Sequence, residues 1–168
     1  LLPLPGWTLP GCYSLGAAQI ALKAQGCAIG EHVVFAGTGP LLYLVAWQYM
    51  KAGNPPLAIL DTSTAAHRLR ALPYLAARPG TLLKGMRLVA DLRRAGVPML
   101  RGVRLLEVGG DAEGVTHFRY ADAAGREKTV ACNAVGMGYH LRAESQLADL
   151  AGCAFGFDPL FRQWLPQV

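Results

Sequence analysis

The stretch from residue 33 to residue 61 constrains the fold of this chain more than any other. It reads VVFAGTGPLLYLVAWQYMKAGNPPLAILD: a short apolar run, a glycine turn and a longer apolar run lead to a second short run ending in Asp61. Short runs that are apolar throughout are typical of parallel strands covered on both faces, and a proline after the turn suits the start of a helix. The pattern predicts a β-α-β unit made of strand 33–36, helix 40–52 and strand 57–61.

The turn Gly37-Thr38-Gly39-Pro40 has the features of an anion-binding loop. Gly37 allows a tight turn out of the strand, and Gly39 leaves room for a pyrophosphate beside the free N–H groups and the positive dipole end of the helix. Thr38 and Pro40 are expected to shape the loop. Asp61 follows Gly37 by twenty-four residues, which suits an acid that accepts hydrogen bonds from an adenosine ribose, although the same acid is equally suited to cap the next helix.

Composition limits the remaining possibilities. The chain has 168 residues, of which 52% are hydrophobic and 16% charged, and this favours a buried parallel sheet or a piece of a larger protein. The net charge of +5 is spread without a basic cluster interleaved with aromatics, so we expect no nucleic-acid binding. Residues 33–50 carry no charge and reach the length of a membrane span, but the glycine turn divides them, so no span is expected. The N-terminal LLPLPGWTLPG lacks the features of a signal peptide.

The residues that commonly carry metal binding and catalysis are scattered. The four cysteines form no CxxC or Cys/His metal pattern, so we expect no metal site, and we expect buried, reduced thiols in a cytoplasmic protein; they are Cys12, Cys27, Cys132 and Cys153. No Ser-His-Asp or Cys-His dyad follows from the spacing. The histidines considered for catalysis are His32, His117 and His140. No catalytic residue is predicted.

The segments on either side of the β-α-β unit complete the expected fold. A loop over residues 1–11 and a short helix over 16–25 precede it. Helices from Ser63 or Thr64 to Ala77 and over 81–95, separated by Pro79-Gly80, and a third strand over 97–101 follow it. Short segments rich in β-branched and aromatic residues predict an antiparallel meander at 103–109, 114–121 and 127–132. A last strand at 133–138 returns to the main sheet, and a short helix near 145–151 precedes FDPLFRQWLP, whose aromatics we expect to be exposed. The predicted class is α/β: a Rossmann-like parallel sheet with flanking helices and an inserted antiparallel three-stranded meander.

This order of elements resembles the NAD(P)-binding domain of FAD-dependent pyridine-nucleotide oxidoreductases. More narrowly, several motifs resemble the flavoprotein subunit of hydrogen cyanide synthase, opine oxidase and proline or hydroxyproline dehydrogenase complexes; they are PGWTLPG, LGAAQIALKAQG, VVFAGTGPLL, LLKG, AGVPMLRGV and LADLAGCAFGFDPLFRQWLP. The resemblance implies a lead segment and helix at 1–30, an NAD(P)-binding domain at 31–138, and a segment at 139–168 that returns toward an FAD domain absent from this chain. It also implies partner subunits and an isolated fragment without turnover.

The resemblance further implies a nicotinamide cofactor that exchanges hydride with the flavin. The residues expected to bind it are Gly37, Thr38, Gly39, Pro40, Asp61, Gly136 and Gly138, of which the last two resemble a late glycine loop of the family. Asp61 favours NAD, because an acid repels a 2′-phosphate. The alternative, NADP, is served by basic residues just downstream, namely His67, Arg68 and Arg70.

Two readings from other classes stay open. An S-adenosylmethionine methyltransferase also uses a glycine-rich first turn, but its first strand usually ends with an acid where this chain has Ala36. A structural or subunit-interaction domain with a degenerate nucleotide site is the other reading. It is favoured by the apolar tail and by Leu42, which stands where the dinucleotide fingerprint has its third glycine.

Overall fold

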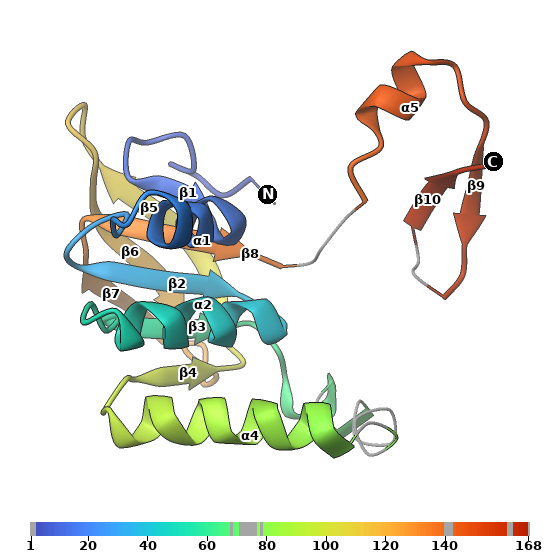
Figure 1. Cartoon of the computed structure of the whole chain (residues 1–168). Coiled ribbons are helices and arrows are strands. Elements are labelled where there is room, and N and C mark those ends of the chain that lie inside the picture. The colour runs from blue at the N-terminus through green and yellow to red at the C-terminus, as the bar shows by residue number, and fades with distance from the viewer. Residues whose placement is uncertain are drawn as a thin grey trace.

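A five-stranded parallel sheet organises the molecule (Figure 1). The computed structural model describes residues 3–67, 69–70, 77, 79–139, 143–160 and 163–167. The strand order is β1-β8-β2-β3-β4, and every neighbouring pair is parallel. The strands are β1 Cys12–Ser14, β8 Ala134–Gly138, β2 Val33–Gly37, β3 Ala58–Asp61 and β4 Met99–Arg101. The predicted β-α-β unit and the returning last strand are confirmed.

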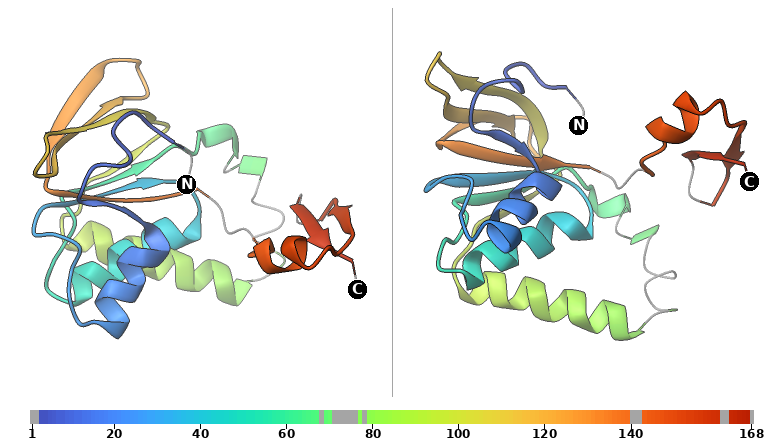
Figure 2. Two further views of the ribbon diagram at one scale, coloured as in Figure 1. Left: turned by 90° about the horizontal axis from the view of Figure 1, so that it is seen from above. Right: turned by 45° about the horizontal axis from the view of Figure 1, so that its top comes forward.

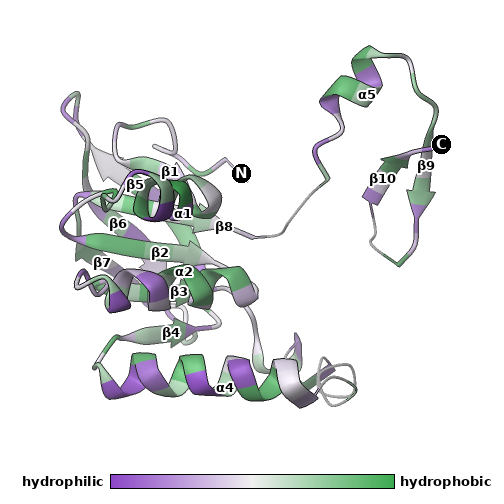
Figure 3. Ribbon diagram, viewed as in Figure 1, coloured by the Kyte–Doolittle hydropathy of each residue, from purple (hydrophilic) through white to green (hydrophobic). Residues whose placement is uncertain are grey.

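Helices cover one face of this sheet (Figure 2). They are α1 Leu15–Ala24, α2 Pro40–Lys51 and α4 Pro79–Arg94. Val33 and Phe35 of β2 belong to the core on this side, which also contains Leu42 of α2 with no exposed surface. In Figure 3, β2 is hydrophobic along most of its length, whereas α4 alternates hydrophobic and hydrophilic residues, as expected for an interior strand and a surface helix.

A second, antiparallel sheet covers the opposite face. It consists of β5 Arg104–Gly110, β6 Val115–Ala121 and β7 Glu127–Ala131, paired in the order β5-β6-β7. Its buried residues, including Phe118 and Tyr120, pack in one core with Val34 and Ala36 of β2. The predicted meander is confirmed. Because it covers one face of the main sheet and the helices cover the other, both the inward and the outward side chains of β2 are buried and apolar.

The structure corrects two details of the predicted elements: it adds a short strand before the first helix, and it moves the start of another helix. Residues 12–14 form β1, a strand that was not predicted after the leading loop, and it pairs with β8. Helix α4 begins at Pro79 instead of after the Pro79-Gly80 pair, because proline is compatible with the first turn of a helix. Of the helix predicted after Asp61, residues 65–67 and 69–70 are helical, and most of the remainder lies outside the described residues.

The carboxyl-terminal segment forms a small unit of its own, drawn apart from the sheets in Figures 1 and 2. It contains α5 Gln146–Leu150, as predicted, and an unpredicted hairpin of β9 Phe155–Asp158 and β10 Gln163–Pro166. The rings of Phe157 and Trp164 pack edge to face with centroids 5.8 Å apart. Both side chains are exposed, at 53% and 64%, as predicted for the aromatics of this segment.

Two further expectations concern the cysteines and the membrane. Cys132 is buried and Cys12 half-buried, but Cys27 and Cys153 are exposed, so the prediction of buried thiols is wrong for those two. Each exposed cysteine follows a glycine-containing turn at the end of a helix. Across the described parts of the chain, no helix is both long and apolar enough to cross a membrane.

Candidate functional site

The carboxyl ends of all five parallel strands lie at one edge of the main sheet. Strand β2 is followed by a connection to β3 on one side, whereas β8 pairs with it on the other side. In an open parallel sheet, the point where successive connections diverge leaves a crevice outside the strand ends, and ligands bind there. The residues at this point are Gly37 at the end of β2 and Gly138 at the end of β8, which are paired in register.

The glycine turn after β2 is tied closely to the end of β8. Gly37 has a φ of 139°, and a Cβ at this position would collide with the carbonyl group of Gly138. The backbone N–H of Thr38 donates to the same Gly138 carbonyl oxygen at 3.0 Å. Gly138 is itself confined, since its own Cβ would lie 2.7 Å from Leu15 Cδ1. These two glycines therefore permit the close approach of two strand ends.

Gly39 is a different kind of glycine, because the space beside it is open. It is the N-cap of α2, with a φ of 91°, and the nearest atom to an added Cβ would be the Tyr139 carbonyl oxygen at 3.9 Å. No side chain caps α2, and Pro40 is at its first position. The first turn of a helix has N–H groups without intrahelical partners and carries the positive end of the helix dipole. An anion can reach this helix end without meeting a side chain at Gly39.

Asp61, at the end of the neighbouring strand β3, is closed by its own chain. The residue is buried, with only 3% of its surface exposed. The carboxylate Oδ2 accepts hydrogen bonds from the Tyr43 hydroxyl at 2.6 Å and from Ser63 Oγ at 2.7 Å. Oδ1 accepts from the Ser63 backbone N–H at 2.8 Å. The acid thus holds the turn that follows β3, whereas the next helix is capped by Thr64, whose hydroxyl oxygen accepts from the His67 backbone N–H at 3.4 Å.

Tyr43 and Arg101 complete this closed end of the site, and the sequence pattern identified neither. Burial, followed by the hydrogen bond to Asp61, raises the pKa of Tyr43 to about 12, so its hydroxyl keeps the proton that it donates. Arg101, the last residue of β4, donates from Nε to the Tyr43 oxygen at 3.3 Å, and its guanidinium lies 5.9 Å from the centre of the tyrosine ring. Tyr43 is four residues beyond Gly39 on α2, a position outside the glycine fingerprint, so no motif marks it.

The remaining predicted site residues are not all at this edge. Gly136 lies inside β8 and is buried, and a Cβ there would meet the Phe35 ring, so its missing side chain is explained by packing. His67 and Arg70 are exposed on the segment after β3, and Arg68 lies outside the described residues. His32 is exposed before β2, His117 is half-buried on β6, and His140 is not described.

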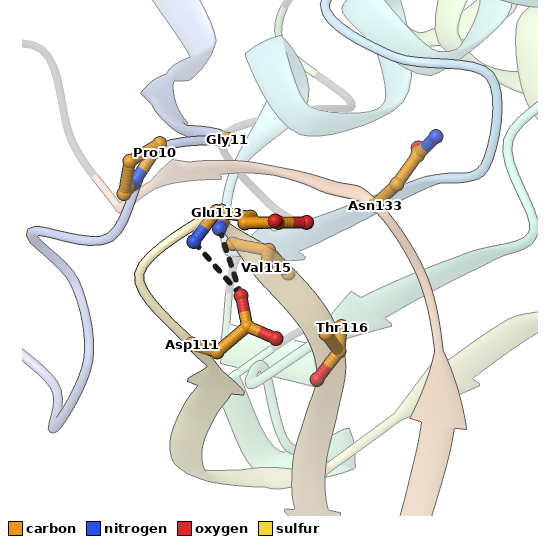
Figure 4. A pocket seen from close by; sticks show the side chains of 8 residues that line it. Pro10, Gly11, Asp111, Glu113, Val115, Thr116 and Asn133 are labelled. Carbon is orange, nitrogen blue, oxygen red and sulfur yellow. Dashed lines mark hydrogen bonds between the residues drawn. The ribbon is translucent and has the colours of Figure 1, made fainter.

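An open hollow of about 320 Å³ lies at the other end of β8 (Figure 4). Pro10, Asp111, Glu113, Thr116 and Asn133 are among its lining residues. Asp111 Oδ1 accepts hydrogen bonds from the backbone N–H groups of Glu113 at 2.9 Å and Gly114 at 3.3 Å, so this acid is used to hold its own turn. Asn133 precedes β8, whereas the glycine turn meets the end of that strand, so the hollow is separate from the candidate site. No group of metal-ligating side chains occurs among the described residues.

Comparison with known proteins relates the chain to subunits of two kinds of enzyme. No family model matches the chain. It is 39% identical over 168 residues to an opine oxidase subunit of Agrobacterium tumefaciens (strain Ach5), a match that covers 98% of this chain and 33% of the relative. It is 30% identical over 162 residues to hydrogen cyanide synthase subunit HcnB of Pseudomonas aeruginosa, covering 93% of this chain and 35% of the relative. The chain is homologous to part of each of these two subunits.

The chain thus spans about a third of the length of the relatives it matches. A solved structure of an FAD-dependent pyridine nucleotide-disulphide oxidoreductase from Desulfovibrio vulgaris has the same fold, with a TM-score of 0.61 and 16% identity over 95% of this chain and 37% of that one. The family resemblance inferred from the sequence motifs is confirmed.

Proposed function

We propose that this chain is the pyridine-nucleotide-binding part of an FAD-dependent oxidoreductase, and that the pyrophosphate of the nucleotide binds at the N-terminus of α2. The observation that carries this proposal is the uncapped helix end beside Gly39, where 3.9 Å separates an added Cβ from the nearest atom. The open N-terminus of this helix lies at the carboxyl ends of the parallel strands, where their connections diverge. It provides N–H donors and the positive end of the helix dipole, and a phosphate can reach it. The residues present therefore fit a pyrophosphate.

Each element of the turn has a separate task in this proposal. Gly37 lets the chain leave β2 against Gly138, and the Thr38 N–H fixes the loop to β8. Gly39 keeps side-chain atoms away from the phosphates, and Pro40 starts the helix whose N–H groups face them. Bound nicotinamide would supply hydride exchange with a flavin. The protein's contribution is to hold the dinucleotide in one position at the sheet edge.

The proposal extends to the parts of the whole protein that lie beyond this chain. Residues 31–138 would bind the nucleotide, 1–30 would lead into that domain, and 139–168 would return toward a domain that holds FAD. Other subunits are the proposed partners, since both relatives are named as subunits of their enzymes. Without the flavin, the isolated chain is expected to bind nucleotide but not to turn over.

The test is calorimetric titration of the chain with NADH, NADPH and ADP-ribose, comparing Gly39→Ala with Gly53→Ala. Gly39 and Gly53 lie at opposite ends of α2, have φ values of 91° and 88°, and neither would make a close contact through a Cβ. The two φ values are alike, but Gly39 also has a ψ of 173°, a combination open essentially to glycine alone, so its alanine variant carries the greater backbone strain and its fold must be checked. We expect Gly39→Ala to weaken binding at least about tenfold, because its methyl group faces the phosphates, and Gly53→Ala to bind as the wild type does.

Two results would overturn this proposal. One is a folded wild-type chain that binds none of the three ligands, which would favour a structural domain with a degenerate site. The other is unchanged affinity in a folded Gly39→Ala variant, since a pyrophosphate at the helix end must lie close to that position. Circular dichroism of each variant establishes that the fold is intact.

A further inference from the structure

The end of β3 departs from the arrangement in which an acid receives the adenosine ribose. We propose that Arg101, instead of Asp61, recognises this part of the nucleotide, and that the site therefore prefers a 2′-phosphorylated adenosine, as in NADP(H), over one with a free 2′-hydroxyl. The inference rests on the proposed function and specifies the ligand that this site accepts. It reverses the preference for NAD that the sequence suggested from Asp61 alone.

The first step is that Asp61 is already occupied. Tyr43 and Ser63 donate three hydrogen bonds to its two oxygens, between 2.6 and 2.8 Å, and the residue is 3% exposed. Among the described residues, one acceptor site on Oδ1 stays unpaired, but the residue is only 3% exposed, so a ribose hydroxyl could reach the carboxylate only if the groups that cover it moved aside. The carboxylate therefore acts on the chain's own turn and on Tyr43, instead of on a ligand.

The second step is that Arg101 stands where a ligand group beyond Asp61 would lie. Asp61 and Arg101 are register partners at the ends of β3 and β4. Arg101 is half-buried and is oriented by Tyr43, through the 3.3 Å hydrogen bond from Nε and the stacking at 5.9 Å. Among the described residues, its two terminal nitrogens have no hydrogen bond or ion pair. A guanidinium held by one nitrogen with two others open is suited to a two-point contact with a phosphate.

The third step concerns charge. The acid that would repel a 2′-phosphate is covered by the Tyr43 hydroxyl, and a positive group stands on the far side of that hydroxyl. Two more basic residues, His67 and Arg70, are exposed on the segment that follows β3. A dianionic phosphate therefore meets donors and cations at this end of the sheet, whereas a neutral hydroxyl faces a carboxylate that is buried and bonded to its own chain.

The experiment compares two ligands that differ only in the 2′-phosphate, ADP-ribose and 2′-phospho-ADP-ribose, by calorimetry at fixed ionic strength. We expect the wild type to bind the 2′-phosphorylated ligand at least about tenfold more tightly. Arg101→Met should abolish this preference, chiefly by weakening the binding of the 2′-phosphorylated ligand. Arg93→Met is the matched control: it removes a charge from the last turn of α4, before the start of β4, and should leave the preference intact.

Two further variants make the test specific to orientation and to the covered acid. Arg101→Lys keeps the charge but not the fork of donors, so we expect it to retain only part of the preference. Tyr43→Phe removes both a hydrogen-bond donor to Asp61 and the group that orients Arg101. We therefore expect the preference for the 2′-phosphorylated ligand to decrease, because Asp61 becomes more available to a ribose hydroxyl and Arg101 is less well placed for the phosphate.

The outcomes separate this inference from the proposed function. Equal wild-type affinity for the two ligands, tighter binding of ADP-ribose, or a full preference retained in folded Arg101→Met would overturn the role of Arg101 and leave the nucleotide site standing. Binding of neither ligand by the folded wild type would overturn both. If Arg101→Met fails to fold, Arg101→Lys decides, because an unchanged preference in that variant contradicts recognition by the planar guanidinium.

Discussion

The ends of β2 and β3 lie side by side at one sheet edge, and they are built in opposite ways. At the end of β2, Gly39 leaves the N-terminus of α2 without a side-chain cap and without a close neighbour. At the end of β3, Asp61 is buried and accepts three hydrogen bonds from its own chain. The end of β2 offers the N–H donors of α2 to a ligand, whereas the acceptor at the end of β3 is bonded to the protein itself.

The difference follows from the groups that each strand end presents. The N–H groups in the first turn of a helix cannot be satisfied by the helix itself, so they need a capping side chain, water or a ligand. A carboxylate at the next strand end needs donors, and a tyrosine and a serine on neighbouring elements supply them. The glycine turn therefore remains an open site, while the acid becomes part of the framework that supports it.

The largest expected effect is at the closed contact between β2 and β8. Gly37→Ala places a methyl group against the Gly138 carbonyl at a φ of 139°, so we expect the free energy of unfolding to fall by about 3–5 kcal/mol, from overpacking and backbone strain together. Urea denaturation followed by circular dichroism measures the change. Gly53→Ala is the control: its φ is 88° and no atom lies within 4 Å of the added Cβ, so it should cost about 1 kcal/mol. Equal losses would show that the strand ends can separate to admit a side chain.

The next largest effect tests whether Asp61 belongs to the framework. Asp61→Ala leaves the Tyr43 hydroxyl and the Ser63 N–H without their acceptor, and we expect a loss of about 2–3 kcal/mol in the same denaturation assay. Asp91→Ala is a suitable control, since this carboxylate also accepts from an aromatic side chain, Trp47 Nε1 at 3.1 Å, but is more exposed. Its loss should stay near 1 kcal/mol or below. A smaller loss for Asp61→Ala than for Asp91→Ala would mean that the acid is free for a ligand.

The contrast between the two strand ends also shows what the sequence can predict. The strands, the meander and the glycine turn follow from local patterns, because apolar runs, turn residues and a glycine-proline helix start each act over a few neighbouring residues. Two of the three hydrogen bonds to Asp61 come from Ser63, two residues later, and are local. The third comes from Tyr43, eighteen residues earlier on α2, which Arg101 contacts from the end of another strand. A local sequence pattern cannot predict that the first turn of α2 and the ends of β3 and β4 bring these side chains together.

Two other differences have similar causes. The short strand β1 was missed because its three residues gain their partners from β8, more than a hundred residues later. Gly136 was assigned to a late glycine loop from the family resemblance, although the strand predicted over 133–138 already includes it; in the structure it lies within β8, against the Phe35 ring. Whether a glycine serves a turn, a strand contact or a ligand is decided by what stands opposite, and that is a property of the folded chain.

A pH titration sharpens the comparison through Tyr43. Its pKa of about 12 in the fold exceeds the ordinary value of 10, so the protonated hydroxyl stabilises the native state below pH 10, and this contribution is lost as the pH rises from 10 to 12. Tyr43→Phe should cost about 1 kcal/mol at pH 7 and should lose less stability than the wild type across that alkaline range. The difference between the wild-type and variant absorbance titrations isolates this one phenol. A midpoint for it near 10 would contradict the closed arrangement around Asp61.

The smallest expected effect is at Thr62, which joins the two strand ends. Its hydroxyl donates to the Gly37 carbonyl oxygen at 3.2 Å, and its backbone N–H donates to the same oxygen at 2.8 Å. Thr62→Val removes the hydroxyl but keeps the backbone bond, so we expect a loss of about 0.5 kcal/mol in unfolding free energy and no change in nucleotide affinity. The double variant with Asp61→Ala should then be additive within about 0.5 kcal/mol, because the backbone bond still fixes the Gly37 carbonyl. Larger coupling would mean that the closed end holds the open end in place, and that nucleotide binding at Gly39 depends on the hydrogen bonds of Asp61.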